Sequence, residues 1–245
     1  MNRILVDDNK NKLFKVRDNE IIIDIKENTN IKIEKVLFNK YIFNIYNSNL
    51  NILSVLENER NIKFEINIFN GNVVFNNISY NSSNMNLEVN LNEKDSLFDL
   101  YNSVICNKSV TYNINVNHNK SYTISNIYNN GLTKDDGSIC FNVSSYAPKK
   151  SKYCNINQDS KIISLNKTNK NSINPVLLID EFESNAKHAA FIGDFNKNEL
   201  FYLMTRGINE VDAKYLLIKG FLIGTLDVCF NEKEILRKKF ETDWR

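Results

Sequence analysis

The chain contains only two histidines, His118 and His188, and a short acidic group precedes the second of them. A neutral imidazole is a ligand that many transition metals accept, so each histidine is a candidate metal site. The carboxylates of Asp180, Glu181 and Glu183 can attract a cation, although an acidic run near a strand end is usually a solvated surface. A lone histidine is also more often a hydrogen-bonded structural residue than a ligand, and for His188 both interpretations stay open.

Four cysteines are scattered along the chain without a CxxC pair, at Cys106, Cys140, Cys154 and Cys229. This pattern predicts reduced, cytoplasmic thiols rather than a disulfide framework. A site held by thiolates needs several converging sulfurs, and the spacing offers none. Cys140 and Cys229 are expected to be small buried hydrophobic residues.

Composition excludes several classes of function. The 31 basic and 29 acidic side chains nearly cancel, which gives no electrostatic basis for binding nucleic acid. No apolar run is long enough to span a bilayer, the N-terminus is not a secretory signal, and no glycine-rich phosphate loop occurs. The sequence therefore predicts a cytoplasmic protein that binds neither nucleic acid, membrane nor nucleotide.

Up to about residue 180, apolar and polar residues alternate with a period of two. Residues 62–68 and 112–118 alternate without a fault, and 31–33, 41–45 and 87–91 are shorter examples. Such alternation indicates half-buried strands, and many short strands predict a sandwich, a barrel or a β-solenoid. One weak interruption, Ser96–Tyr101, is compatible with a single helical turn.

Asparagine is unusually frequent, with 44 residues against 7 glycines and 2 prolines. Because asparagine tolerates the left-handed backbone, we expect it to supply most of the turns. The expected turn sites are Asn47–Asn49, Asn70–Asn72, Asn81–Asn84 and Asn129–Gly131.

The last fifty residues have helical periodicity. Asn196 and Asn209 are placed as N-caps of two helices, and Gly207 is placed as the stop of the first. A third helical segment is expected from Glu232 to about Glu241. We therefore expect a β domain over residues 1–194 and a C-terminal helical domain over 195–245.

Residues 175–222 resemble the SufB/SufD family of iron–sulfur cluster assembly proteins. They read PVLLIDEFESNAKHAAFIGDFNKNELFYLMTRGINEVDAKYLLIKGFL. The matching landmarks are Pro175, His188 thirteen residues later, the run FYL at 201–203, RGI at 206–208, and the DA of the next helix at 212–213. Fainter landmarks extend the resemblance to residues 116–225, whereas residues 1–110 match only in strand character.

The resemblance implies a right-handed parallel β-helix followed by a small C-terminal α-helical domain. It also implies a non-catalytic subunit that pairs with its family partner through the β-helix and with the ATPase SufC through the helical tail. No cofactor is expected to be held stably by this chain alone, and iron or a transient iron–sulfur cluster is expected at the interface. Many members begin with a helical domain, but this sequence starts in strand patterns and is expected to be a short form.

Within the family, the sequence resembles the SufD branch. The SufB branch carries a cysteine where Gln158 or Ser160 stands here, and a glutamate after the histidine where this chain has Ala189. The expected partners are therefore a SufB-like subunit and SufC. By the same resemblance His188 is the iron- or cluster-associated residue at the SufB interface, against a structural role between the last strand and the tail. His118 shares a strand face with core residues and is interpreted as structural.

The SufC-facing residues implied by the resemblance are Phe201, Tyr202, Arg206 and Gly207. The alternative is a buried aromatic side of the helical hairpin, with Arg206 binding helix-end carbonyls and Gly207 as a C-cap. Two other functions stay open for the whole chain: a homodimeric β-solenoid interaction module, and a β-solenoid enzyme acting on polysaccharide. The enzyme would need paired carboxylates on neighbouring rungs, which the sequence does not display.

Overall fold

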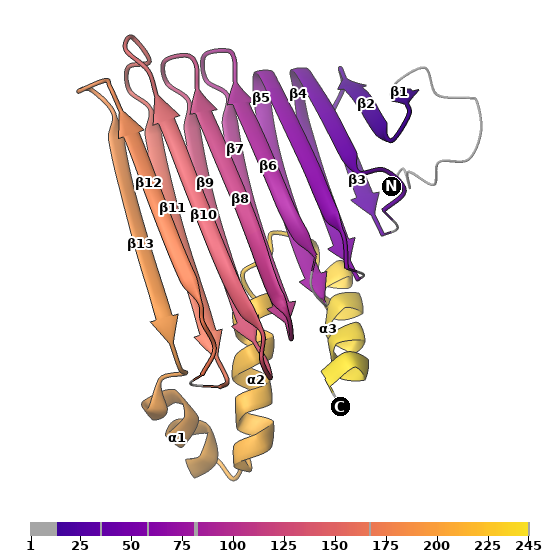
Figure 1. The fold of residues 1–245 in the computed structure, drawn as a ribbon, viewed down its shortest axis with the longest axis vertical. Coiled ribbons are helices and arrows are strands. Elements are labelled where there is room, and N and C mark those ends of the chain that lie inside the picture. The colour runs from indigo at the N-terminus through magenta and orange to yellow at the C-terminus, as the bar shows by residue number, and fades with distance from the viewer. Residues whose placement is uncertain (1–13, 35, 58, 81–82, 167, 245) are drawn as a thin grey trace.

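The computed structural model describes residues 14–244, apart from 35, 58, 81–82 and 167. Thirteen strands of this part of the chain wind into a flattened parallel β-solenoid, and three helices follow them (Figure 1). This confirms the predicted solenoid with a helical C-terminal region. The change from strands to helices falls between Gly193 and Lys197.

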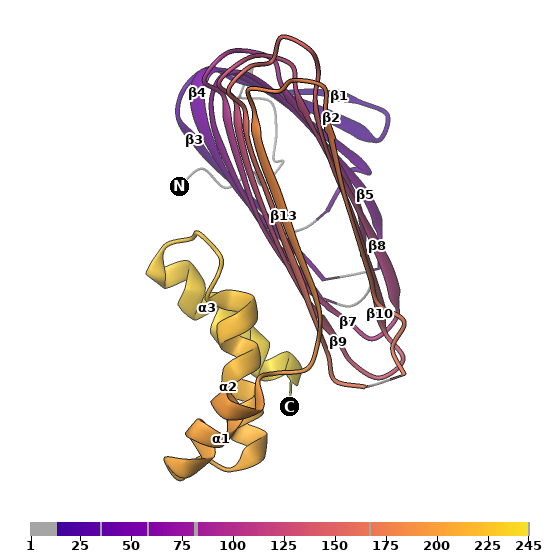
Figure 2. The ribbon, with the colours of Figure 1, turned by 90° about the vertical axis from the view of Figure 1, so that its left-hand side faces the viewer.

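Each rung of the solenoid contributes one strand to each of two faces, seen edge-on in Figure 2. Strands β4 (Lys40–Leu56) and β5 (Asn61–Tyr80) run through both faces, because their two halves pair with different neighbours. The first face otherwise contains β1 (Phe14–Arg17), β2 (Glu20–Ile25), β6 (Asn84–Leu91), β8 (Ser109–His118), β10 (Ser138–Ala147) and β12 (Ser172–Ile179). The second face contains β3 (Thr29–Ile33), β7 (Leu97–Cys106), β9 (Ile124–Thr133), β11 (Asn155–Ser164) and β13 (Asn185–Gly193). All pairs are parallel except β1 with β2.

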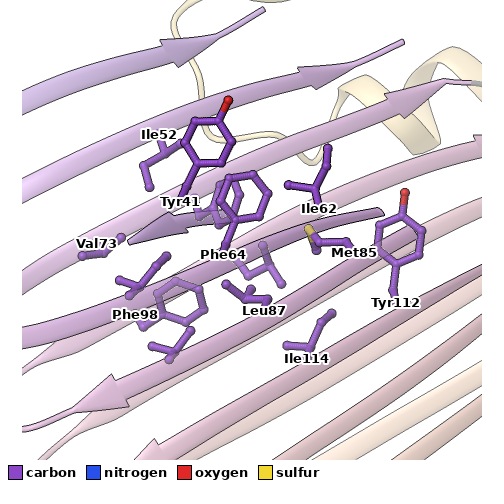
Figure 3. Close-up of a cluster of buried hydrophobic side chains, with 14 of the residues drawn as sticks. Tyr41, Ile52, Ile62, Phe64, Val73, Met85, Leu87, Phe98, Tyr112 and Ile114 are labelled. Atoms are coloured by element: carbon purple, nitrogen blue, oxygen red, sulfur yellow. The ribbon is translucent and has the colours of Figure 1, made fainter. Parts of the chain in front are cut away.

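Alternation along each strand sends one set of side chains into the solenoid. In β6, Met85, Leu87, Val89 and Leu91 are buried while the residues between them are half-buried, as the period of two predicts. Residues of the early rungs that share this interior form a hydrophobic cluster, which includes Tyr41, Phe64 and Phe98 (Figure 3). The ring centroids of Phe64 and Phe75 lie 5.0 Å apart. The main hydrophobic core thus lies between the two faces, and a smaller cluster of Ala147, Cys154 and Ile156 lies in the last rungs.

The expected helical turn at Ser96–Tyr101 was wrong, because Leu97–Cys106 form β7. Phe98 and Leu100 are fully buried in the interior, so the period of two continues through this segment. The expected turn at Asn129–Gly131 was also wrong, because these residues lie within β9. Gly131 is needed there because a Cβ would lie 2.7 Å from the Ile139 side chain.

The asparagines mostly bond across rungs instead of making turns, which corrects the expectation from composition. Asn47 and Asn70 do adopt the left-handed backbone, at corners within β4 and β5, but the other non-glycine residues with positive φ are not asparagines. They are Asp18, Asp95, Tyr122, Asp135, Lys150 and Tyr153. The expected turn at 81–84 falls largely outside the described residues.

Carboxamides form ladders instead. On the outside of the first face, Asn67 donates to Asn44, Asn90 donates to Asn67, and Asn117 donates to Asn90, at 2.9–3.0 Å. Inside the second face, Asn77 donates to Asn102, Asn102 to Asn129, and Asn129 to Ser160. The inner ladder is fully buried, so these bonds satisfy polar groups that no water reaches.

The three helices are α1 (Lys197–Thr205), α2 (Glu210–Ile223) and α3 (Phe230–Trp244). Helices α2 and α3 pack on the outside of the second face, whereas α1 has no buried residue and packs against α2. Ile218, Leu222 and Ile223 of α2 are buried with sheet residues that include Ile78 and Leu132. None of the helices in the described part of the chain is long and apolar enough to cross a membrane.

The end of α2 is fixed to the sheet by polar side chains of three rungs. Asn130 donates to the carbonyl of Phe221 at 2.8 Å, and Ser103 donates to that of Leu222 at 2.6 Å. Asn76 donates to the carbonyl of Asp227 and accepts from its N–H. Since the last carbonyls of a helix have no partner within the helix, the sheet here completes the hydrogen bonding of α2.

Candidate functional site

The two histidines lie in different environments. His118 ends β8 and is fully buried, with its ring nitrogens 2.8 Å from Thr123 Oγ1 and 2.9 Å from Ser125 Oγ. Burial lowers the pKa of His118 to about 4, because the protein interior disfavours the imidazolium. The structural interpretation of His118 is therefore confirmed.

Acid is expected to destabilise the protein through His118. Its folded-state pKa lies below its ordinary value of about 6.5, so this contribution is complete above pH 6.5 and is lost as the pH falls towards 4. This lowering of the His118 pKa corresponds to about 3 kcal/mol of unfolding free energy. Urea unfolding across this pH range should show the loss, and His118→Gln should flatten it. Equal pH dependence in both proteins would contradict the assignment.

His188 lies on the last rung of the solenoid, exposed at the middle of β13. It pairs in register with Gln158 of β11, whose side chain is buried in the interior. His188 therefore points in the inward direction, but at the end of the solenoid no further rung covers it. Its side chain makes no hydrogen bond to any described residue, so the structural role between strand and tail has no support in this part of the chain.

The last rung forms a largely apolar surface around His188, which we call the open end. It comprises the residues of β12 and β13 whose register partners point into the core: Ile173, Pro175, Leu177, Ile179, Ala186, His188, Ala190 and Ile192. Ile192 pairs with Ile162, which is fully buried, yet is itself 46% exposed. Pro175 lies within β12 rather than at its start, which an edge strand tolerates. The open end thus continues the inward-facing columns of the core, but no further rung of the described chain packs on it.

The interior beneath the open end is polar, unlike the interior of the early rungs. It holds Ser125, Asn129, Ser145, Gln158 and Ser160, all buried. The Gln158 carboxamide crosses the interior and donates to Ser145 Oγ at 2.8 Å. Polar core residues therefore collect next to His188.

The acidic group before His188 has structural partners on the turns. Glu183 pairs with Lys152 at 2.7 Å, and Asp180 accepts from the Tyr146 hydroxyl at 3.3 Å. In the described residues, no group of three or more histidines, cysteines and carboxylates is arranged to hold a metal ion.

The cysteines are separate from one another, and one expectation about them was wrong. Cys106 and Cys154 are buried, and burial raises the pKa of the Cys106 thiol to about 12. Cys140 is only half-buried on β10, and Cys229 is exposed after α2. Neither is therefore the buried hydrophobic residue that the sequence predicted, and Cys229 lies in the connection between α2 and α3.

The α1–α2 hairpin presents aromatic residues to solvent. Phe201 is 68% exposed and Tyr202 57%, so the alternative of a buried aromatic side is wrong. Arg206 lies over the Tyr202 ring, with its guanidinium carbon 5.2 Å from the ring centroid. Gly207 has φ +86°, and the N–H groups of Gly207 and Ile208 close the end of α1 on Met204 and Leu203, as in a Schellman cap. Gly207 is therefore the C-cap of α1, close in sequence to the exposed rings of Phe201 and Tyr202.

Comparison with known proteins identifies the chain. Residues 61–221 match the family described as SUF system FeS cluster assembly, SufBD core domain. The chain belongs to the SufB/SufD family. The match begins upstream of residue 116, so the family similarity extends further into the solenoid than the sequence landmarks predicted.

Three curated relatives are named as iron–sulfur cluster assembly proteins. The iron–sulfur cluster assembly protein SufD of Bacillus subtilis is 38% identical over 96 residues, which are 39% of this chain and 22% of that protein. A SufBD family protein of Pyrococcus horikoshii is 49% identical over 47 residues, 19% of this chain and 10% of that protein. A SufBD family protein of Staphylococcus saprophyticus is 25% identical over 105 residues, which are 43% of this chain and 23% of that protein. The matched segments thus span less than a quarter of the relatives' own lengths.

This SufB/SufD-family chain carries its exposed candidate residues in two places. His188 lies on the open end, and Phe201, Tyr202, Arg206 and Gly207 lie on the α1–α2 hairpin. Sequence reasoning treated Gln158 as a family landmark and as a replacement for a cysteine, and it missed the burial of Gln158 beside His188. Its burial and its register with His188 depend on pairing between strands 30 residues apart.

Proposed function

We propose that this chain is a SufD-like, non-catalytic subunit of the SUF assembly scaffold. It pairs with a SufB-like chain through the open end and with the ATPase SufC through the α1–α2 hairpin. His188 faces the cluster that is assembled between the two solenoids, where the partner supplies the remaining ligands. Localisation in the cytoplasm is part of this proposal.

The observation that carries the proposal is the open end. β12 and β13 each have one neighbour only, so each leaves an unpaired edge at the last rung. Exposed strand edges pair readily with another sheet, and apolar side chains of the open end such as Ile192 lie along these edges. A second solenoid placed here would cover the apolar residues and enclose His188.

The SufD branch is favoured by the residues around His188. Ala189 follows it, where the SufB branch has a glutamate, and Gln158 is its register partner, where the SufB branch has a cysteine in this region. Two of the relatives named above are more than 30% identical to this chain, and the one that matches over more residues is named SufD. The hairpin supports a second interface, because α1 has no buried residue.

The proposal is tested by co-expressing the chain with a SufB-like chain and a SufC ATPase from the same genome. Co-elution of the three in size-exclusion chromatography is expected. A stable dimer of this chain that excludes the SufB-like protein would instead support the homodimeric module. Turnover of a polysaccharide would support an enzyme, and both results would overturn the proposal.

His188→Ala is expected to leave the complex intact and to lower cluster assembly in it at least about tenfold, since losing even a supporting partner of a metal ligand has effects of this size. Iron–sulfur absorbance per complex after reconstitution measures this. Lys187→Ala, the neighbouring outward residue on β13, is the matched control. Unchanged assembly in the His188 variant would contradict the ligand role.

A further inference from the structure

One buried polar atom next to the open end has no partner. Gln158 is 1% exposed, and its Nε2 donates to Ser145 Oγ at 2.8 Å and to the Val176 carbonyl at 3.3 Å. Because a carbonyl can only accept, the atom facing Val176 must be the amide nitrogen. The other carboxamide atom, Oε1, is therefore an acceptor, and it has no hydrogen bond to any described residue.

The register places this acceptor beneath His188. Gln158 and His188 are partners in the parallel pairing of β11 with β13, and both belong to the inward column of their strands. Neighbouring strands lie about 4.8 Å apart, so a carboxamide on one reaches an imidazole on the next with a single hydrogen bond. Buried acceptors are nearly always satisfied in folded proteins, so this oxygen is an acceptor that a donor on the open end can reach.

We propose that Gln158 is the positioning residue of His188. The exposed His188 ring makes no hydrogen bond to a described residue, so it is free to turn onto Gln158, whose Oε1 then accepts the N–H of one ring nitrogen. This bond fixes the tautomer and leaves the other ring nitrogen unprotonated and turned away from the core. Histidines that bind metals commonly donate their second ring N–H to a fixed oxygen in this way. The biological meaning of this arrangement rests on the proposed function, because it prepares His188 to meet a cluster.

The rest of the Gln158 side chain is suited to this role. Its amide nitrogen is anchored on β10 and β12 of the opposite face, so the carboxamide plane is held from across the interior. The polar residue next along β11, Ser160, accepts from Asn129 and lies under Ala190 instead of His188. Of Gln158 and Ser160, only Gln158 has an acceptor without a hydrogen-bond partner and a histidine as its register partner on β13.

The test is ¹H–¹⁵N NMR of the imidazole nitrogens in the isolated full-length chain at mildly alkaline pH. Two histidines give two sets of signals, and His118 serves as the internal reference. We expect one dominant tautomer for His188 in the wild type. Gln158→Met, which keeps the length but removes the acceptor, should shift His188 to the tautomer mixture of free imidazole. Ser160→Ala should leave the His188 tautomer unchanged.

The outcomes are separable from the proposed function, because the measurement needs no partner and no cluster. A His188 tautomer ratio that is the same in wild type and Gln158→Met would overturn the positioning role even if the complex forms. A shift in Gln158→Met supports it even if no complex forms. Should Gln158→Met fail to fold, Ser145→Ala is the substitute. It removes one anchor of the amide and should give a smaller shift in the same direction, and no shift would count against the proposal.

Discussion

Replacing Asn102 by leucine is expected to destabilise the protein by about 2–6 kcal/mol, although leucine is the more hydrophobic residue. Asn102 is fully buried, accepts from Asn77 Nδ2 at 2.8 Å and donates to Asn129 Oδ1 at 2.9 Å. Leucine would leave one donor and one acceptor unsatisfied in the core, at a cost of about 1–3 kcal/mol each. Urea unfolding followed by circular dichroism measures the loss.

The matched control is Asn113→Leu in an outer ladder. Asn113 also donates to one asparagine and accepts from another, Asn86 and Asn142, but it is only half-buried. Water can replace its lost partners, so we expect a cost below about 1 kcal/mol. An equal loss of unfolding free energy in the two variants would show that burial does not determine how much the ladder hydrogen bonds contribute to stability.

Ile192→Glu should abolish stable association with the SufB-like chain while leaving the fold intact. Ile192 is half-exposed on the open end, so the isolated chain can hydrate the carboxylate. In the complex the carboxylate would be buried without a partner, and a cost of about 3 kcal/mol lowers the affinity roughly 100-fold. Size-exclusion chromatography of the co-expressed chains, with calorimetry of the purified components, measures the effect.

Leu37→Glu is the corresponding control, because Leu37 is also an exposed apolar residue but follows β3, in the first rungs. Its complex should form as in the wild type. If both variants lose the partner, general loss of solubility explains the result. If neither does, the open end is not the interface.

The sequence predicts the strands well, because side-chain alternation is a local property. Residues 62–68 and 112–118 lie in β5 and β8 with the expected faces inward, and that parity placed His118 in the core. The caps at Asn196 and Asn209 were also predictable and are confirmed, since each side chain accepts from an N–H two or three residues later. Nothing in these features requires knowledge of distant residues.

The solenoid repeat was hidden because its length changes along the chain. The ladder bonds join residues 20 apart between Asn44 and Asp24, then 23 apart, then 27 between Asn117 and Asn90, and finally 32 between Asn174 and Asn142. The strand segments stay alike while the connections between them lengthen. A search at a fixed period cannot detect such a repeat, and without the rungs the asparagines look like turn residues.

The candidate site was predictable only in part for the same reason. His188 was found by its place in a family motif, but the contacts that surround it join strands of different rungs and opposite faces, such as Gln158 and Ser145. The residues that attach the end of α2 to the sheet are even further apart in the sequence, since Asn76 and Asp227 are separated by 151 residues. Local patterns carry no information about such pairs.

The outer ladders have a direction, and this bears on how the solenoid changes in length. Two ladders run along the outside of the first face, one from Asn44 to Asn117 and the other from Asn113 to Asn174, and in both each amide nitrogen donates to a residue of the preceding rung. Except at the last asparagine of each ladder, the side-chain oxygen accepts from the next rung, whatever the length of the connection between the rungs. Insertion or deletion of a whole rung would preserve the pattern on both sides, so the hydrogen bonding itself sets no limit on the number of rungs.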